Sequence, residues 1–295
     1  MLIFDPLQLA ALAAVHRRGS FDFAAADLGV TQSAVSQRLR ALEERAGTLL
    51  IRRGSPSVAT EAGLRLIRHY DAVVLLERQV AEELPGVQAG AVSLRIAVNA
   101  DSLATWVMPA LAQVPGVLFD LVIDDQDFSQ DWLRRGEVVA AITAHAGPLQ
   151  GCDTQPLGAL RYVATASPDY MARWFPGGVT AAAVARAPAL TYSDKDRLQA
   201  LWVAARGLGA RAEFPSHRIA STHGFVDACL LGLGWGLNPE PLVAGHLAAG
   251  RLVEVVPGTP HDVALHWQFA RLTAGAIAPL TRALRGAAAQ MLRLQ

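Results

Sequence analysis

The apolar positions of this chain follow two different rhythms. Up to about residue 84 they recur at helical spacing, first in short segments and then in a long one. From residue 92 onward, short apolar runs alternate with helical segments, which is typical of α/β layers built on parallel strands. The 295 residues exceed what one core usually holds, so we expect two or three domains. The patterns predict an α+β protein of several domains.

Residues 1–60 are predicted to form a small helical unit with a hairpin. Three helical segments follow one another, and each ends at a glycine. The stretch "LLIRRGSPSVAT" then holds two β-prone pieces around Gly54-Ser55-Pro56, which predicts a hairpin. The residues suited to begin the second and third helices are Ser20 and Thr31, and those that end the three helices are Gly19, Gly29 and Gly47.

A long helix is predicted over residues 61–84, capped by Thr60 and ended by Pro85-Gly86. A long helix with an apolar seam outside any compact domain usually pairs with a second copy of itself. Residues 61–91, which include the short linker "GVQAGA", are therefore expected to form a dimerisation helix and hinge. Packing of this helix onto its own chain remains an alternative. Two seams are available: Ile67, Tyr70, Val74, Ala81 and Leu84, or Leu66, Tyr70, Val73 and Val80.

The remaining residues are predicted to form two α/β subdomains. The last strand and final helix should return to the first subdomain, so that the second is an insertion between two crossovers. We expect subdomain I to comprise residues 92–163 and 267–295, and subdomain II residues 164–266. The expected strands cover residues 92–98, 118–124, 138–143, 162–165, 189–192, 252–255 and 265–270. The expected helices cover residues 103–113, 129–135, 168–174, 180–185, 196–205, 224–231, 241–248 and 276–294.

Composition excludes several classes of protein. Charged residues make up 18% of the chain and balance to a net charge of +0, which argues against disorder. The two cysteines, Cys152 and Cys229, lie far apart and suggest neither a metal cluster nor a disulfide framework. The N-terminal segment carries Asp5 and Pro6 before its apolar run and its arginine pair after it, the wrong order for a secretion signal. We therefore expect a cytoplasmic protein with no membrane span, metal or cofactor.

The segment "SFDFAAADLGVTQSAVSQRLRALEE" carries the strongest functional signal. Two short helices meet at a glycine turn, as a helix-turn-helix requires. The second helix turns Val35, Leu39 and Leu42 inward and places hydrogen-bonding side chains on its opposite face, where they suit base edges and phosphates. Between residues 31 and 58, five arginines oppose two glutamates, a local excess of positive charge. A solvated helix is the alternative. The predicted DNA-binding residues are Gln32, Ser33, Ser36, Gln37, Arg38, Arg40, Arg52 and Arg53.

These elements resemble a known family. The segment "LAALAAVHRRGSFDFAAADLGVTQSAVSQRLRALEERAGTLLIRR" is similar to the N-terminal domain of LysR-type transcriptional regulators, and so is the T-x-A-G element at Thr60, Ala62 and Gly63. The stretches "AVNADSLATW", "RRGEVVAAIT", "PLGALRYVATAS" and "GLGWGLNPE" are similar to the ArgP/LysG branch of that family. The resemblance implies a winged helix-turn-helix, a linker helix and a sensor like periplasmic binding proteins.

The branch resemblance also implies a function. Its members sense lysine and arginine and control the export of basic amino acids. It implies partners as well: double-stranded DNA, L-lysine or L-arginine, further copies of the chain in a dimer or tetramer, and RNA polymerase, as expected of an activator. A regulator that responds to another small carboxylate or amino acid is the alternative. A transport-type binding protein would lack the helix-turn-helix, and an enzyme should show a nucleophile elbow, a phosphate loop or a metal-spaced histidine set, none of which occurs.

The ligand should lie where the sensor strands end, in the cleft between the subdomains. Ser102, Thr143 and Thr222 are assigned to an α-carboxylate, because hydroxyls beside a helix N-terminus suit an anion. Acidic side chains, namely Asp101, Asp125 and Asp194, are assigned to the ligand amines. The predicted effector residues are Asn99, Asp101, Ser102, Asp125, Thr143, Tyr192, Asp194 and Thr222. The alternatives are helix caps for Asp101, Ser102, Asp194 and Asp196, a surface role for His223, and packing for Trp235 and Trp267.

Overall fold

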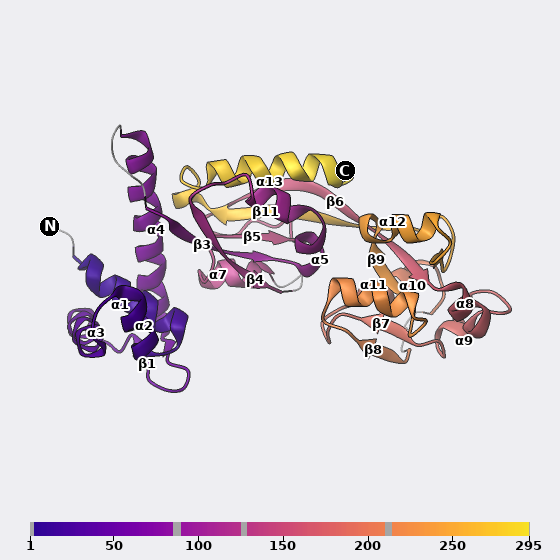
Figure 1. Ribbon diagram of the computed structural model, residues 1–295, viewed down its shortest axis with the longest axis horizontal. Helices are drawn as coiled ribbons and strands as arrows, with labels where there is room; N and C mark the ends of the chain where they lie inside the picture. Colours follow the sequence, from indigo (N-terminus) through magenta and orange to yellow (C-terminus); the bar gives the residue numbers. More distant parts are fainter. Residues whose placement is uncertain (1–2, 85–89, 125–128, 210–213, 295) are drawn as a thin grey trace.

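The computed structural model describes residues 3–84, 90–124, 129–209 and 214–294. Its parts follow one another along the long axis of the molecule (Figure 1). The N-terminal helices lie at one end of the long helix α4, the main sheet lies in the middle, and the second sensor subdomain lies at the far end. Within these residues no helix is long and apolar enough to cross a membrane.

The N-terminal unit has the helices that the sequence predicts. They are α1 (Pro6–Arg18), α2 (Phe21–Leu28) and α3 (Gln32–Ala46), followed by a hairpin of β1 (Ile51–Arg52) and β2 (Val58–Ala59). The Ser20 hydroxyl accepts from the backbone N–H of Asp22, and the Thr31 hydroxyl accepts from that of Ala34. The buried core lies between these helices, and α3 contributes Val35, Leu39 and Leu42 to it. The predicted winged helix-turn-helix architecture is confirmed.

The joint between the hairpin and α4 (Glu61–Glu83) is tight. The Thr60 hydroxyl accepts from the backbone N–H of Gly63 at 3.1 Å and donates to the carbonyl of Leu49 at 2.9 Å. A Cβ at Gly63 would lie 2.2 Å from the Leu50 carbonyl oxygen, closer than any real contact allows. The T-x-A-G element therefore places a cap and a glycine where the backbone that leads into β1 crosses the first turn of the helix.

The helix α4 packs against both halves of its own chain. Ile67 belongs to the N-terminal core, whereas Leu75 belongs to the main core of the sensor. The Arg78 guanidinium also donates to the carbonyl of Gly116 in the sensor. Part of the surface of α4 is thus buried against its own chain, as the alternative to self-pairing predicts. A stripe of apolar side chains remains exposed on it: Leu76 (38%), Val80 (54%) and Leu84 (51%).

The main sheet holds seven strands in the order β10-β6-β11-β5-β3-β4, with β9 paired to β6 off this path. The strand β3 runs parallel to β4 and β5, as expected, but β11 runs antiparallel to β5 and β6. The α/β pattern suggested parallel sheets, but this sheet is mixed, because the chain leaves subdomain I along β6 and returns along β11. The strands are β3 (Val92–Val98), β4 (Val117–Ile123), β5 (Ala140–Thr143), β6 (Cys152–Ala166), β9 (Gly236–Pro239), β10 (Val253–Glu254) and β11 (His261–Ala270).

Two long strands connect the subdomains. The sequence predicted a strand only over residues 162–165, but β6 begins at Cys152 and pairs with β11 up to Tyr162. Pro156, Gly158 and a register shift in β11 interrupt the apolar pattern, so the first two thirds of β6 did not look like a strand. The predicted return of β11 to β5 is present, and the boundaries expected at 163/164 and 266/267 fall inside these two strands.

Helices cover both faces of the sheet in subdomain I. On one side, α13 (Ala278–Met291) packs on a helical segment that follows β3, and α7 (Ser129–Arg135) packs on the other side (Figure 1). The segment after β3 begins at Ala100, three residues earlier than predicted. It consists of α5 (Ala100–Ser102), a π-helical turn η1 (Leu103–Val107) and α6 (Met108–Leu111).

Subdomain II surrounds a small parallel pair of strands, β7 (Ala189–Thr191) and β8 (Ser216–Arg218). Trp235 is fully buried here and Trp267 in the main sheet, which confirms a packing role for both. The strand β9 arises from "GLGWGLNPE" and was not predicted. Its first residue, Gly236, lies so close to α11 (Thr222–Leu230) that a Cβ there would be 2.4 Å from the Phe225 ring. The helices are α8 (Pro168–Trp174), α9 (Ala181–Val184), α10 (Leu198–Ala205), α11 (Thr222–Leu230) and α12 (Glu240–Ala248), and a 3-10 turn η2 (Arg271–Thr273) follows β11.

Candidate functional site

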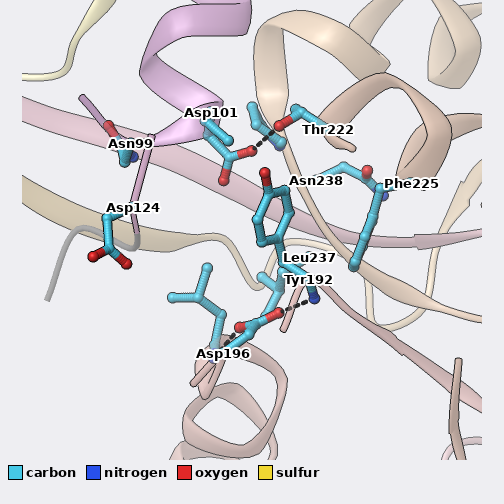
Figure 2. Close-up of a pocket in the computed structure, with 12 residues that line it drawn as sticks. Asn99, Asp101, Asp124, Tyr192, Asp196, Thr222, Phe225, Leu237 and Asn238 are labelled. Carbon is cyan, nitrogen blue, oxygen red and sulfur yellow. Dashed lines mark hydrogen bonds between the residues drawn. The ribbon is translucent and has the colours of Figure 1, made fainter. Parts of the chain in front are cut away.

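A small cleft of about 50 Å³ lies between the two sensor subdomains (Figure 2). One wall comes from the chain that follows β3 and β4, and the other from the ends of β7 and β9 and the start of α11. This is the position that the strand order predicts for a ligand. The cleft is lined by Asn99, Ala100, Asp101, Asp124, Tyr192, Asp196, Leu198, Thr222, Phe225, Leu237, Asn238 and Pro239.

Asp101 connects three parts of the sensor. Its carboxylate accepts a hydrogen bond from the Tyr162 hydroxyl at 2.8 Å and another from the Thr222 hydroxyl at 2.8 Å. Burial raises the pKa of this carboxyl group, and the two hydrogen bonds act in the opposite direction. Because its carboxylate bonds to β6 and α11, Asp101 is not simply a cap for its own helix. The contact joins the two walls of the cleft.

Asp196 accepts the first backbone N–H of α10, whose N-cap residue is Arg197, and also faces the cleft. Its carboxylate accepts from the backbone N–H of Tyr192 at 2.8 Å and from that of Leu198 at 3.0 Å, at the start of α10. The sequence suggested this capping role but did not place Asp196 among the effector residues. Asp196 lines the cleft because α10 begins at the cleft wall. The sequence does not show where in space this helix begins.

Asp124 lies at the end of β4 and contacts described residues of both subdomains. Its carboxylate accepts from the Trp132 indole N–H at 2.8 Å and lies 3.2 Å from the Lys195 ammonium nitrogen. From the acidic run after β4, the prediction selected Asp125. Asp125 lies outside the described residues, and the structure places Asp124 in the lining.

Four predicted effector residues lie in the cleft, namely Asn99, Asp101, Tyr192 and Thr222. Ser102 and Thr143 are fully buried and lie outside the lining, so the hydroxyl trio assigned to a carboxylate does not meet at the cleft wall. The Ser102 hydroxyl has no hydrogen-bond partner among the described residues, and that of Thr143 accepts from the His145 N–H at 3.1 Å.

Asp194, a predicted effector residue, lies away from the cleft. Its carboxylate lies 2.7 Å from Arg218 and is 74% exposed, outside the cleft lining. The predicted strand over residues 189–192 was almost right, since β7 ends at Thr191. The loop that follows turns Asp196 toward the cleft and Asp194 toward solvent. His223 is exposed, as its alternative interpretation held.

The lining of the cleft is acidic and partly aromatic. Three carboxylates line it, and no lysine or arginine is found among the described lining residues. Tyr192 and Phe225 add ring surface, and burial together with the nearby Asp101 charge raises the pKa of the Tyr192 hydroxyl. Carboxylates in a partly buried cleft favour a cationic ligand, because a nearby positive charge offsets the cost of burying them.

A second candidate surface lies on α3. Gln32, Ser33, Gln37 and Arg40 are exposed on it, opposite the apolar face that enters the core. Ser36 and Arg38 are half-buried on the same helix. Arg52 and Arg53 are exposed in the hairpin, where the Arg53 guanidinium lies 5.0 Å from the centre of the Phe21 ring. The predicted DNA-binding side chains thus lie on α3 and on the wing, which is the hairpin of β1 and β2.

These features define a class of protein, which two family profiles identify. The profile described as "Bacterial regulatory helix-turn-helix protein, lysR family" matches residues 7–64, and the "LysR substrate binding domain" profile matches residues 88–293. The chain belongs to the LysR family of transcriptional regulators.

Similar proteins narrow the relationship to the ArgP/LysG branch. The transcriptional regulator ArgP of Pseudomonas aeruginosa strain UCBPP-PA14 is 44% identical over 289 residues, which cover 96% of each chain. The crystal structure of ArgP from Mycobacterium tuberculosis is 42% identical, covers 100% of both chains and has a TM-score of 0.83. Full-length LysG from Corynebacterium glutamicum with its bound effector Arg is 35% identical, covers 98% of this chain and 100% of that one, and has a TM-score of 0.72. These relationships confirm the predicted family and branch, and they agree with a regulator rather than an enzyme.

Proposed function

We propose that this protein is a DNA-binding transcriptional regulator whose effector is a basic amino acid, L-lysine or L-arginine. The observation that carries the proposal is the cleft, which three carboxylates line without a lysine or arginine among the described lining residues. A ligand with two positive charges matches such a lining better than a neutral or anionic one. The arginine-bound LysG relative, 35% identical over nearly the whole chain, supports this choice.

The amino acid has three charged groups, and the cleft offers a site for each. Two helical segments begin at the cleft wall, one at Ala100 and the other at Thr222. Their first backbone N–H groups favour the α-carboxylate. Asp101 and Asp124 lie on the same cleft and are available to the α-amine and the side-chain cation. Asp124 takes the role first assigned to Asp125, and Asp194 is removed from the set.

The N-terminal unit supplies the DNA-binding surface. We assign base contacts to the α3 residues Gln32, Ser33, Gln37 and Arg40, and phosphate contacts to the remaining members of the predicted set. The exposed apolar stripe of α4 supports self-association over residues 61–84, which brings two recognition helices onto two half-sites. We infer a cytoplasmic homodimer or homotetramer that contacts promoter DNA and RNA polymerase and controls an exporter gene.

The domain division supports linkage between the two sites. We divide the chain into a winged helix-turn-helix (1–60), a linker helix (61–91), sensor subdomain I (92–163 and 267–295) and sensor subdomain II (164–266). Only β6 and β11 carry the chain across between the sensor subdomains, which allows them to close on a ligand. If the ligand binds the closed sensor more tightly than the open one, binding shifts the equilibrium between these two states. That shift is then transmitted to the DNA-binding unit.

Two measurements on the full-length protein test this function. Isothermal titration calorimetry with L-lysine, L-arginine and L-norleucine should show binding of the two basic amino acids and little or none of norleucine, which lacks the side-chain cation. A mobility shift with DNA from upstream of the protein's own gene should show a specific complex that these ligands alter. Equal binding of norleucine would favour the alternative, a regulator of another amino acid, and turnover of any ligand would contradict a regulatory role.

A further inference from the structure

Among the described residues, an ion pair beside the cleft joins one sensor subdomain to the other. The Lys195 ammonium nitrogen, in the loop between β7 and α10, lies 3.2 Å from Oδ1 of Asp124, at the end of β4. The other carboxylate oxygen of Asp124 accepts the Trp132 indole N–H at 2.8 Å, which fixes the orientation of the group. Lys195 is also the only lysine of the 295-residue chain, in which every other basic side chain apart from histidine is arginine.

The size of the cleft shows what this ion pair does. A cavity of about 50 Å³ has room for a few water molecules at most, whereas ligand pockets usually measure roughly 300 Å³ or more. The cleft must therefore widen before an amino acid enters. Because Asp124 and Lys195 belong to opposite subdomains, widening of the cleft separates them. The Asp101–Thr222 hydrogen bond joins the same subdomains, but it is not charge-assisted on both sides.

We propose that Lys195 is an internal competitor of the effector: its ammonium holds Asp124 in the empty sensor, and the side-chain cation of a basic amino acid displaces it. The proposal rests on the proposed function, because it assumes that the side-chain cation of the effector binds in that same cleft. The chain supplies at Asp124 the ammonium group that free lysine carries. The Lys195 side chain is already 49% exposed in the ion pair, so its charge is easily solvated after displacement.

This competition makes Lys195 a determinant of specificity. A ligand without a side-chain cation leaves Lys195 on Asp124 and gains nothing by opening the contact. A ligand with such a cation replaces the Lys195–Asp124 ion pair by an ion pair of its own, so the free-energy cost of breaking the first pair is largely offset. Removing Lys195 therefore helps lysine, which can then approach Asp124 without a competitor. It does not help norleucine, which would face an additional unneutralised carboxylate.

The test compares Lys195→Met with Lys195→Arg in the full-length protein by calorimetry with L-lysine and L-norleucine. Lys195→Met should lower the Kd for lysine about two- to fivefold, the range for a partly exposed ion pair, and should raise the preference for lysine over norleucine. Lys195→Arg keeps the charge and should stay close to wild type. The gain should shrink at high salt, because screening weakens the contact in the wild type.

The matched control is Arg218→Gln, which removes a cation from the exposed Asp194 pair near the same loop and should change neither Kd. In an Asp124→Asn background, Lys195→Met should lose its effect on lysine binding. Weaker lysine binding by Lys195→Met, or an equal shift for lysine and norleucine, would overturn the competitor role while leaving the proposed function intact. A wild-type protein that binds neither lysine nor arginine would overturn the proposed function itself.

Discussion

The two functional surfaces of this protein differ in what their side chains do before a ligand arrives. On α3, Gln32, Gln37 and Arg40 are exposed, and none of their side chains makes a hydrogen bond or ion pair to another described residue. In the sensor cleft, by contrast, Asp101 and Asp124 already accept hydrogen bonds from the protein itself. One surface is ready for its partner, whereas the other must exchange internal contacts for those of a ligand.

This difference fits the two tasks. A rigid helix with open donors can read DNA with little rearrangement, since its apolar face fixes its position on the core. A cleft whose carboxylates join opposite walls cannot accept a ligand without moving those walls. Binding energy is then coupled to the relative position of the subdomains, which is the requirement for an allosteric signal.

The sharpest test of this comparison is Asp101→Asn. The variant keeps the shape of the side chain but removes the charge that we pair with a ligand amine, so L-lysine binding should weaken by about 30-fold or more. Calorimetry measures the loss, and a mobility shift without ligand should show unchanged DNA affinity. Loss of DNA binding in the same variant would show that the two regions are not separate.

The converse test is Arg40→Ala. A side chain that contacts a base contributes about 1–3 kcal/mol to discrimination, so specific DNA affinity should fall roughly 5- to 150-fold. The affinity for L-lysine should stay at the wild-type value. The matched control is Arg65→Ala on α4, whose guanidinium pairs with Glu61 on the exposed side of the helix. An equal loss from both variants would mean that Arg40 contributes only general positive charge.

The same contrast explains which residues the sequence could predict. The caps Ser20 and Thr31 and the inward face of α3 depend on residues a few positions apart, and the structure confirms them. The strand ends likewise predicted Asn99, Asp101, Tyr192 and Thr222 at one edge of the sensor, and all four line the cleft.

The sequence could not predict the contacts between distant segments. The bonds of Asp101 join it to residues 61 and 121 positions away, so no local pattern distinguishes it from a helix cap. The length of β6 depends on its pairing with β11, about a hundred residues later. The choice between Asp194 and Asp196 depended on how one loop turns. Such features follow from tertiary packing, which local spacing does not encode.

Proton exchange offers a further way to separate the two regions. Burial raises the pKa of Asp101, so the empty cleft holds a proton on this group up to a higher pH than an exposed aspartate does. A ligand ammonium favours the ionised form, and lysine binding should therefore release protons and weaken as the pH falls through this pKa. Calorimetry in buffers of different ionisation enthalpy measures the release, which Asp101→Asn should abolish. Proton uptake would contradict the assignment.

The raised pKa of Asp101 also predicts how the free energy of unfolding depends on pH. In the pH range between the unfolded and folded pKa values, the native state binds the proton more tightly than the unfolded state does. The contribution of Asp101 to the free energy of unfolding therefore decreases as the pH rises through that range. Asp101→Asn should remove this contribution, which denaturant titrations at several pH values can follow.

A smaller effect is expected at the wing. Arg52 is exposed in the hairpin, and we assign it to a phosphate rather than a base. Arg52→Ala should weaken specific and unrelated DNA about equally, and should reduce the slope of log affinity against log salt by about 0.9. Titrations by fluorescence anisotropy at several salt concentrations measure the slope. A loss confined to the specific sequence would assign Arg52 to a base edge instead.

The smallest effect is expected from Asp194→Asn. The sequence assigned this carboxylate to a ligand amine, but the structure pairs it with Arg218, with 74% of Asp194 and 67% of Arg218 exposed. An ion pair exposed to this extent contributes about 1 kcal/mol or less to stability. The Kd for L-lysine should stay within about twofold of wild type, whereas Asp124→Asn in the cleft should raise it clearly. If Asp194→Asn instead weakened binding as strongly as Asp101→Asn, the loop after β7 would have to turn over when the ligand enters. The cleft would then be assembled by its effector, and the contrast with the preformed surface of α3 would be larger still.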